Sequence, residues 1–336
     1  MPRAALLTKS VVFLALDCFL AGADMNAIPS MRDMFCQYVA QVELEVSTYC
    51  NRHCSFCSNS VADRRGGNRY MDDALYSGIL RQLSDLGWSG VLSFHRYNEP
   101  LADRPYILRR IDEAKRSLPN ALLRIYTNGD YLNQGYCEDL YAVGLRSMVV
   151  SAYPAETRSY SGVELRHLAE QSAARLGLPY KVVDECEGEV CIRILFGDMN
   201  LTLQARDYTQ VTNGKGEILA YDRGGTVPLA VAYQRVSPCF RPFLELQVEC
   251  DGTVMPCCNL RSDVEVHSGC AITRLTPETD ILEVWGGKAF SRWRQSMLNY
   301  EPKSSPCAGC AMHVLGDTPD NRLAVEQLRQ LYSSLG

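Results

Sequence analysis

The chain has 336 residues, of which 46% are apolar and 22% are charged, with a formal net charge of −5. This length allows about two domains with a sizeable core, and the composition is that of an ordinary globular protein. The acidic balance and the lack of a basic stripe argue against a nucleic-acid partner. We therefore expect a small-molecule substrate.

Residues 1–40 precede the regular pattern and are predicted to form an N-terminal extension, either disordered or upstream of the true translation start. Alternative starts are Met25, Met31 and Met34. The apolar run at 10–23 has some character of a secretory signal. Asp17 interrupts it, and it is shorter than the roughly 20 apolar residues of a membrane-spanning helix. We expect a cytoplasmic protein without a membrane segment.

Short β-rich runs alternate with amphipathic helical runs over residues 41–226. Strands are predicted near 42–46, 90–94, 122–126 and 147–151 and from 180 onward, and helices near 72–87, 104–117, 133–143 and 163–176. Such alternation predicts βαβ units with a parallel sheet. We expect one α/β domain whose active site lies at the carboxyl ends of the strands.

The alternation of predicted strands and helices ends after residue 226. Residues 227–315 are rich in loops and cysteines, with turn signals such as Asp251-Gly252. They are predicted to form a second, smaller domain, followed by a C-terminal helix within 316–336.

The chain contains 15 cysteines, and such a count indicates either disulfides or metal sites. The number is odd, the chain is much larger than a disulfide-stapled domain, and several cysteines fall into two groups with ligand-like spacing. Metal binding is therefore favoured.

The first group is Cys50-Asn-Arg-His-Cys54-Ser-Phe-Cys57, in a loop that follows the first predicted strand. Iron-sulfur cubanes normally take four cysteines, so three would leave one iron free for another ligand. Zinc usually prefers paired cysteines and a closed fourth position. Three cysteines without a metal are the remaining alternative.

This C-x3-C-x2-C spacing, with the aromatic Phe56, resembles the loop of radical S-adenosylmethionine (SAM) enzymes. The resemblance implies a partial (β/α)6 TIM-like barrel and a 4Fe-4S cluster held by Cys50, Cys54 and Cys57, whose free iron binds SAM. In this family, reduction of the cluster cleaves SAM to methionine and a 5'-deoxyadenosyl radical. A flavodoxin- or ferredoxin-type protein is the expected reductant.

The same resemblance implies further contacts to SAM. Phe56 would lie near the adenine, and Tyr97-Asn98-Glu99-Pro100 resembles the Gly-Gly-Glu motif that holds the methionine amino group. A Glu99 carboxylate facing an ammonium would form a charge-assisted hydrogen bond. Asn128 would approach the ribose, and Ser151 matches a polar contact of the family. The alternatives are a solvated carboxylate, an ordinary turn and a structural serine.

The second group follows the pattern C-x12-G-x4-C, a gap, then C-x2-C. It consists of Cys239, Gly252, Cys257, Cys307 and Cys310. The spacing resembles the twitch domain, a shortened SPASM domain with one auxiliary 4Fe-4S cluster on four cysteines. A four-cysteine zinc ribbon is the alternative. Cys258 is expected to point away from Cys257 and to pack in the core.

Segments such as Ser93-Phe-His and Arg223-Gly-Gly resemble twitch enzymes that act on aminocyclitols and amino sugars in aminoglycoside-type antibiotic biosynthesis. This implies abstraction of a hydrogen atom from a carbinol carbon and oxidation to a ketone, with the auxiliary cluster as electron acceptor. Arg223 matches an arginine at the substrate hydroxyl, where a fixed cation would favour the alkoxide. Its alternative is an exposed turn arginine.

Related enzymes are redox-neutral sugar epimerases in which a cysteine thiol returns a hydrogen atom to the substrate. Cys186 and Cys191 are candidates for this role, although each could simply pack in the core. Modification of a peptide and a non-enzymatic binding module are further alternatives.

Overall fold

A computed structural model describes residues 30–154, 158–210, 212–217, 219, 221–227 and 233–333. Its helices are α2 (Met31–Tyr38), α3 (Asp73–Leu86), α4 (Arg104–Ser117), α5 (Gln134–Ala142), α6 (Gly162–Ala174), α7 (Arg241–Leu244), α8 (Ile281–Gly286), α9 (Lys288–Met297) and α10 (Pro319–Ser333). Short 3-10 helices are η2 (Ser58–Ser60), η3 (Pro100–Ala102) and η4 (Glu265–His267). The predicted extension at 1–29 lies outside the described residues.

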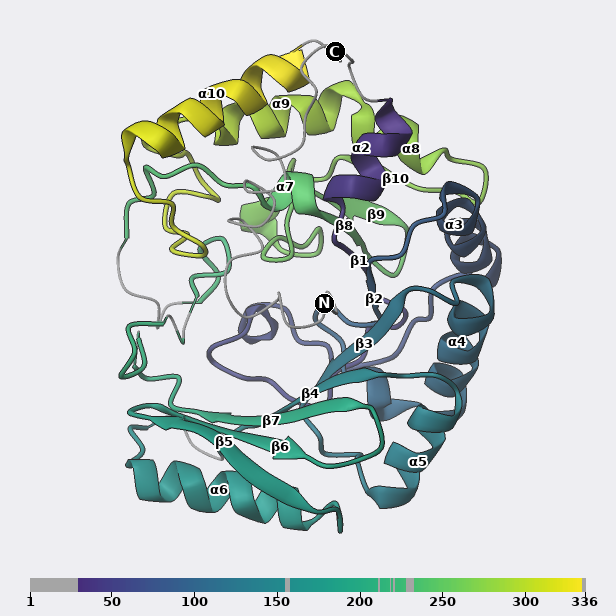
Figure 1. The fold of residues 1–336 in the computed structure, drawn as a ribbon, viewed down its shortest axis with the longest axis vertical. Coiled ribbons are helices and arrows are strands. Elements are labelled where there is room, and N and C mark those ends of the chain that lie inside the picture. The colour runs from purple at the N-terminus through teal and green to yellow at the C-terminus, as the bar shows by residue number, and fades with distance from the viewer. Residues whose placement is uncertain are drawn as a thin grey trace.

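The strands form one curved sheet (Figure 1). They are β1 (Gln41–Leu44), β2 (Val91–Ser93), β3 (Leu122–Thr127), β4 (Ser147–Ala152), β5 (Tyr180–Cys186), β6 (Glu189–Ile194), β7 (Asn200–Arg206), β8 (Glu245–Val248), β9 (Thr253–Met255) and β10 (Thr273–Arg274). Their order is β10-β9-β8-β1-β2-β3-β4-β7-β6-β5. The six strands from β8 to β7 are parallel, and the two at each end run antiparallel to their neighbours. The predicted α/β fold with a partial parallel barrel is confirmed.

Helices α3, α4 and α5 cover the convex face of the sheet (Figure 1). Each barrel helix begins with a side-chain N-cap that accepts a hydrogen bond from a backbone N–H of the first turn. The caps of α3 to α6 are Asp72, Asp103, Asn133 and Ser161. Such caps typically contribute about 1 kcal/mol each, which explains why these helices start where the sequence predicts.

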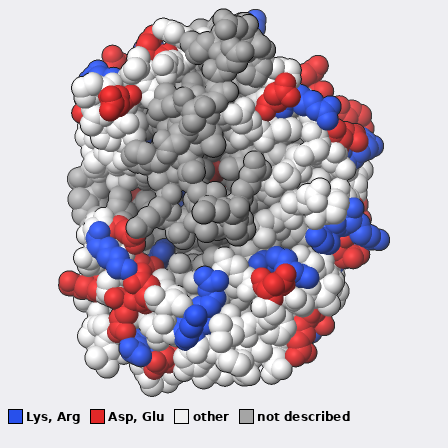
Figure 2. Space-filling model, in the orientation of Figure 1, with Lys and Arg blue, Asp and Glu red and all other residues white. Residues whose placement is uncertain are grey.

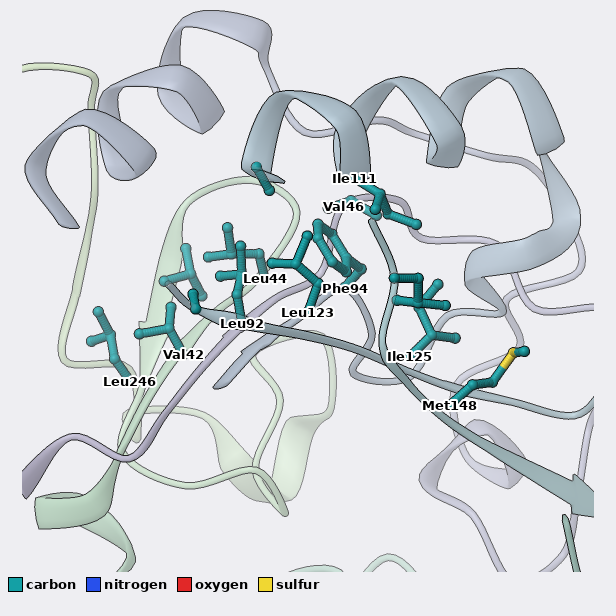
Figure 3. Close-up of a cluster of buried hydrophobic side chains, with 14 of the residues drawn as sticks. Val42, Leu44, Val46, Leu92, Phe94, Ile111, Leu123, Ile125, Met148 and Leu246 are labelled. Carbon is teal, nitrogen blue, oxygen red and sulfur yellow. The ribbon is translucent and has the colours of Figure 1, made fainter. Parts of the chain in front are cut away.

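The core lies between the sheet and these helices. Because side chains alternate along a strand, Leu44, Leu92 and Leu123 point toward α4, where Ile111 meets them (Figure 3). All four side chains are almost fully buried. Burial of a side chain of this size stabilises the fold by roughly 1.5–3 kcal/mol.

The opposite, concave face of the same strands is polar. One register row crosses the six parallel strands, and every residue in it is polar: Gln247, Glu43, Ser93, Arg124, Ser147 and Asn200. A polar lining of this kind would be costly in a dry core. The concave face therefore has the chemistry of a site rather than of a packed barrel interior.

The prediction for residues 180 onward needs correction. These residues do form a strand, β5, but it belongs to an antiparallel hairpin with β6, and β7 is the next parallel strand beside β4. Gly188, with φ +79° in the turn, allows a connection too short for a helix. Apolar and polar residues alternate with a period of two in parallel and antiparallel strands alike. The sequence pattern therefore did not predict β6 and β7 or the direction of their neighbours.

Part of the predicted N-terminal extension is ordered structure. Residues Met31–Tyr38 form α2, which begins at a capping box on Ser30 and packs against α8. The ring of Phe35 meets that of Trp285 edge-on, with centroids 5.4 Å apart. The boundary near 226 stays a prediction, although the sheet continues across it because β8 pairs with β1.

Acidic and basic side chains lie next to one another around the face shown in Figure 2. Within the described part of the chain, no helix is long and apolar enough to span a bilayer.

Candidate active site

The first cysteine group lies in the loop between β1 and η2. The Cys57 N–H donates to the carbonyl of Cys54 (3.1 Å), and the Cys50 N–H donates to the carbonyl of Arg64 (3.3 Å). All three cysteines are half-buried and free of disulfides. The loop therefore carries the three cysteines at the carboxyl end of β1, where their thiols act on one another's charge.

The surroundings of these thiols oppose negative charge. Burial raises the pKa of Cys50 to about 11, with Glu99 and Cys57 adding to the shift. Burial also raises the pKa of Cys54 to about 12, with Cys57 adding to it. Thiolates are the metal-binding form, and a bound cation would offset this mutual repulsion. The donor set thus fits a cationic metal cluster.

Glu99 joins this loop to the end of β3. Its backbone N–H donates to the carbonyl of Tyr49 (2.7 Å). Its carboxylate accepts from the Thr127 hydroxyl (2.6 Å) and from the Asn128 N–H (2.8 Å). Burial raises the pKa of the Glu99 carboxyl group to about 7, although these hydrogen bonds act to lower it. A buried carboxylate beside a thiol cluster suits a cationic ligand group such as an ammonium.

Asn128 belongs to a polar network that the sequence did not reveal. Its amide donates to Asn51 Oδ1 (2.7 Å), and Asn51 donates to Asp130 Oδ2 (2.7 Å). Arg52 forms a bidentate ion pair with the same Asp130 carboxylate. The cysteine loop and the Thr127–Asp130 turn are therefore held as one unit.

The predicted adenine contact, Phe56, lies in an aromatic cluster. Its ring stacks on Tyr208, with centroids 3.8 Å apart and an interplanar angle of 11°, and is tilted against Tyr153 at 5.1 Å. Burial and the nearby Tyr208 raise the pKa of the Tyr153 hydroxyl, and Ser151 acts against this rise. Both tyrosines come from segments without a motif, so only the fold brings them to Phe56.

Asn98 is turned toward the protein. Its amide donates to Ser47 Oγ (3.2 Å) and to the carbonyl of Phe94 (3.4 Å), and its Oδ1 accepts from the Arg96 N–H (2.9 Å). These bonds shape the loop that carries Glu99. A role for Asn98 in cofactor binding stays a prediction.

The second cysteine group surrounds a cavity that is formed by residues between 224 and 310. Its lining residues include Cys239, Cys257, Cys307 and Cys310, brought together from three separate segments. Burial raises the pKa of Cys307 to about 12, with Cys239 and Cys310 adding to the shift. Four thiols around one cavity fit a cluster with four cysteine ligands. Among the described residues, no three Cys, His, Asp or Glu side chains converge closely enough for a single metal ion.

The segment Arg223–Thr226 connects the two cysteine groups. At one end the Thr226 hydroxyl lies 2.7 Å from that of Ser58, next to Cys57. At the other end Gly224 lines the four-cysteine cavity, and Arg223 NH1 donates to Asn259 Oδ1 (3.0 Å). The sequence suggested Arg223 but not that its segment spans both groups.

Arg223 is a partly buried cation on the segment that joins the two groups, in the left-handed region with φ +50°. Burial alone would lower the pKa of its guanidinium, but the nearby Tyr97, Cys57 and Cys258 raise it above the ordinary value. Its Nε has no hydrogen-bond partner among the described residues. The alternative of an exposed turn arginine does not hold.

Cys258 lies in a turn, at Cys257–Leu260, and not on an extended segment. The adjacent Cys257, followed by Arg241, Arg223 and Arg96, lowers the pKa of its thiol. Cationic groups from distant segments therefore act on this thiol. The expectation that Cys258 packs in the core stays a prediction.

Cys186 and Cys191 lie on the β5–β6 hairpin. Cys186 is close to Asp184 and Lys215 at the rim. Cys191 contacts Glu189 (Sγ to Oε1, 3.7 Å), and burial raises its pKa to about 12. Their role as hydrogen donors stays a prediction.

Comparisons with known proteins agree with this geometry. The SPASM family, an iron-sulfur cluster-binding domain, matches residues 239–311, a range that contains all four cysteines of the second group. S-adenosyl-L-methionine-dependent 2-deoxy-scyllo-inosamine dehydrogenase of Niallia circulans is 36% identical over 124 residues, which are 37% of this chain. The match spans 49% of that enzyme's length.

The fold is also found in a solved structure. The crystal structure of BtrN in complex with AdoMet and 2-DOIA superposes with a TM-score of 0.54 and 24% identity, over 77% of this chain and 86% of that one. SuiB of Streptococcus suis bound to S-adenosylmethionine gives a TM-score of 0.45 and 15% identity, over 77% of this chain and 68% of that one.

Proposed function

We propose that this chain, a radical SAM enzyme with a SPASM-type domain related to 2-deoxy-scyllo-inosamine dehydrogenase, oxidises a secondary alcohol of an aminocyclitol or amino sugar to a ketone. The substrate loses the carbinol hydrogen as an atom, the hydroxyl hydrogen as a proton, and one further electron. Two electrons are therefore removed in all. The relative acts on 2-deoxy-scyllo-inosamine by its name, and that compound is the first substrate to test.

Cys50, Cys54 and Cys57 would hold the first 4Fe-4S cluster, and Cys239, Cys257, Cys307 and Cys310 the auxiliary one. When bound, the first cluster with SAM supplies the hydrogen-abstracting radical, and the auxiliary cluster accepts an electron. Glu99 would hold the SAM ammonium, while Asn128 and the ring of Phe56 would orient the nucleoside. A flavodoxin- or ferredoxin-type protein would deliver the first electron.

The position of Arg223 is the observation that carries the proposal. Its segment touches the first cysteine loop through Thr226 and Ser58 (2.7 Å) and lines the second cavity through Gly224. An oxidation that needs a radical source and an electron acceptor requires both to be near one substrate. Arg223 lies on the segment that joins the two cysteine groups.

The charge of Arg223 gives it a chemical role there. A fixed guanidinium lowers the pKa of a neighbouring hydroxyl, because it stabilises the alkoxide. Its buried Nε, which has no partner among the described residues, is a donor available to a substrate oxygen. The polar concave face, with Glu43 and Arg124 in one register row, suits a polyhydroxylated amine.

The test is anaerobic reconstitution with iron, sulfide, SAM and a chemical reductant, followed by incubation with 2-deoxy-scyllo-inosamine. Equal amounts of 5'-deoxyadenosine and a ketone product are expected. An Arg223→Lys variant should retain part of the activity, and Arg223→Met should lose about 100-fold or more, as positioned electrostatic donors do. SAM cleavage without any ketone from aminocyclitols or amino sugars would refute the assignment.

Redox-neutral epimerisation is the second candidate, and the placement of Cys258 favours it. Cys258 directly precedes Asn259, whose Oδ1 accepts from Arg223 NH1 (3.0 Å), so we add its thiol to Cys186 and Cys191 as a candidate hydrogen-atom donor. Reaction in deuterium oxide separates the outcomes, since an epimer gains one carbon-bound deuterium and a ketone does not. If epimerisation occurs, Cys258→Ala should convert it to ketone formation, while Cys186→Ala and Cys191→Ala should not.

A further inference from the structure

Arg235 is a buried cation that lines the four-cysteine cavity, with only 1% of its surface exposed. Its guanidinium donates to five main-chain carbonyl oxygens at 2.5–3.4 Å. These belong to Ser237, Pro238, Cys310, Met312 and His313. Arginine has five N–H donors, so neutral carbonyls satisfy the whole group.

The positive charge of Arg235 has no counter-ion within the described part of the protein, where no carboxylate lies within ion-pair distance of it. Burial of a cation without an anion is costly. The thiol of Cys310, which can form an anion, lies 3.9 Å from Arg235, measured from NH1 to Sγ. The charge of Arg235 is therefore placed for an anion inside the cavity.

Lys303 repeats this arrangement. It is 6% exposed, and its Nζ donates to the carbonyls of Asn299 (2.8 Å) and Glu301 (2.7 Å) and to Asn299 Oδ1 (2.5 Å). All three acceptors are neutral oxygens. The charges that act on Lys303 are those of Arg235, Glu301, Cys239 and Cys307. Arg235 lines the four-cysteine cavity, and Lys303 is hydrogen-bonded to the main chain of Arg235 (2.9 Å), so two buried cations whose hydrogen-bond acceptors are neutral lie together at this cavity.

The two residues also join the segments that carry the cysteines. The Arg235 N–H donates to the carbonyl of Ala308 (2.7 Å), between Cys307 and Cys310, and the Lys303 N–H donates to the carbonyl of Arg235 (2.9 Å). The Arg235 side chain adds the bonds to residues 310–313. The segment that leads to Cys239 is thereby hydrogen-bonded to the loop that carries Cys307 and Cys310.

We propose that Arg235 and Lys303 are positioning residues of the auxiliary iron-sulfur centre, which set the spacing of its ligands and raise its reduction potential. This inference rests on the proposed function, because it requires a cluster in the cavity. A cluster on four thiolates is anionic and gains a further negative charge on reduction. Nearby buried cations stabilise the reduced form, since net charge and hydrogen bonding set the potential of such clusters. A more positive potential makes the centre a better acceptor for the electron of a substrate radical.

The test is a redox titration of the full chain, monitored by electron paramagnetic resonance. The parent carries Cys50→Ala, Cys54→Ala and Cys57→Ala, so that the signal comes from the auxiliary centre alone. Arg235→Gln and Lys303→Met should each shift the midpoint potential to more negative values. Arg235→Lys and Lys303→Arg, which keep the charge, should stay near the parent value. Arg110→Gln is the matched control, because Arg110 is equally buried but lies on α4 in the outer helix layer.

Unchanged midpoints in Arg235→Gln and Lys303→Met, with full iron content, would overturn the proposal. Iron loss from both of these variants but not from the charge-keeping ones would support it, because a cation would then be required to hold the cluster. Iron loss from all four would overturn the role of charge. A parent that binds no auxiliary cluster would instead refute the proposed function.

Discussion

The hydroxyl oxygens of Ser58 and Thr226 lie 2.7 Å apart, although 168 positions separate the two residues in the chain. Ser58 follows the last cysteine of the first loop, and Thr226 ends the segment that begins at Arg223. Both side chains are buried. This contact fixes the distance between the first cysteine loop and the segment that leads to the second cavity.

The Ser58–Thr226 contact should appear as a coupling energy in a double-mutant cycle. Thr226→Val leaves the buried Ser58 hydroxyl without this partner, which costs about 1–3 kcal/mol. After Ser58→Ala the Thr226 hydroxyl still donates to the carbonyl of Arg223 (2.9 Å), so this variant should lose about 0.5–1.5 kcal/mol. The double variant should be less destabilised than the sum, by about 0.5–1.5 kcal/mol of unfolding free energy in denaturant titration. Ser84→Ala, at an exposed position on α3, should combine additively with Thr226→Val, and additivity at Ser58 as well would contradict the contact.

Replacement of Cys50, Cys54 or Cys57 by Ala should abolish 5'-deoxyadenosine formation. The cluster needs three thiolates, and each variant leaves only two. Reconstituted protein is assayed for SAM cleavage by chromatography. Cys36→Ala is the control, since Cys36 lies on α2, where its thiol donates to the carbonyl of Leu86 (3.4 Å). Full cleavage in all three loop variants would remove the basis of the radical SAM assignment.

Gly224→Ala should be more harmful than Gly225→Ala. Both glycines have positive φ, +67° and +86°, so an added Cβ strains either backbone by about 1–2 kcal/mol. At Gly224 the Cβ would also lie 2.5 Å from His267 Nε2 and 2.8 Å from Leu260 Cδ2, whereas at Gly225 nothing lies within 4 Å. Overpacking adds about 1–3 kcal/mol.

Thermal unfolding of the two glycine variants measures this difference. The auxiliary centre should also lose iron in Gly224→Ala, because Gly224 lines its cavity. Equal stability and iron content in both variants would show that the close approach at Gly224 has no consequence.

His95 should make the protein less stable in mild acid. Burial, with Arg124, Arg96 and Arg223 nearby, lowers the pKa of His95 to about 3, against an ordinary value near 6.5. The unfolded chain therefore binds a proton between about pH 6.5 and 3 that the folded protein does not, so stability rises with pH over this window. This contribution should cost about 1.4 kcal/mol at pH 5.5 relative to pH 7.5.

Denaturant titrations of wild type and His95→Gln at the two pH values test the effect. The variant should lose this component of the pH dependence, while His167→Gln, at an exposed site on α6, should retain it. The same pH dependence in wild type and His95→Gln would show that His95 titrates normally.

Local features of the fold were accessible from the sequence. Asp72, Asp103 and Asn133 stand before apolar-periodic runs, and the helices begin at the next residue. The strands that alternate with these helices were found for the same reason, since capping and side-chain period are local. The hairpin of β5 and β6 escaped prediction because the choice of neighbour in a sheet depends on residues that are remote in the chain.

The candidate site also has features that local sequence predicts and features that depend on residues far apart in the chain. The spacing of Cys50, Cys54 and Cys57 within one loop, and of Cys307 and Cys310 in another, indicates metal ligands by itself, because few residues separate the donors. The cationic groups that lower the pKa of the Cys258 thiol were not predicted, since the three arginines come from distant parts of the chain. The stacking of Tyr208 on Phe56 was not predicted for the same reason.

By itself, then, the sequence determined which groups of cysteines could act together and the parallel α/β class, since both follow from short-range spacing. Only the tertiary structure decided what accompanies those groups: Arg223 on the segment that joins them, the cations that act on Cys258, and Arg235 and Lys303 at the second cavity. The energies of buried charges depend on which neighbours replace water around them, and that is settled when the chain folds.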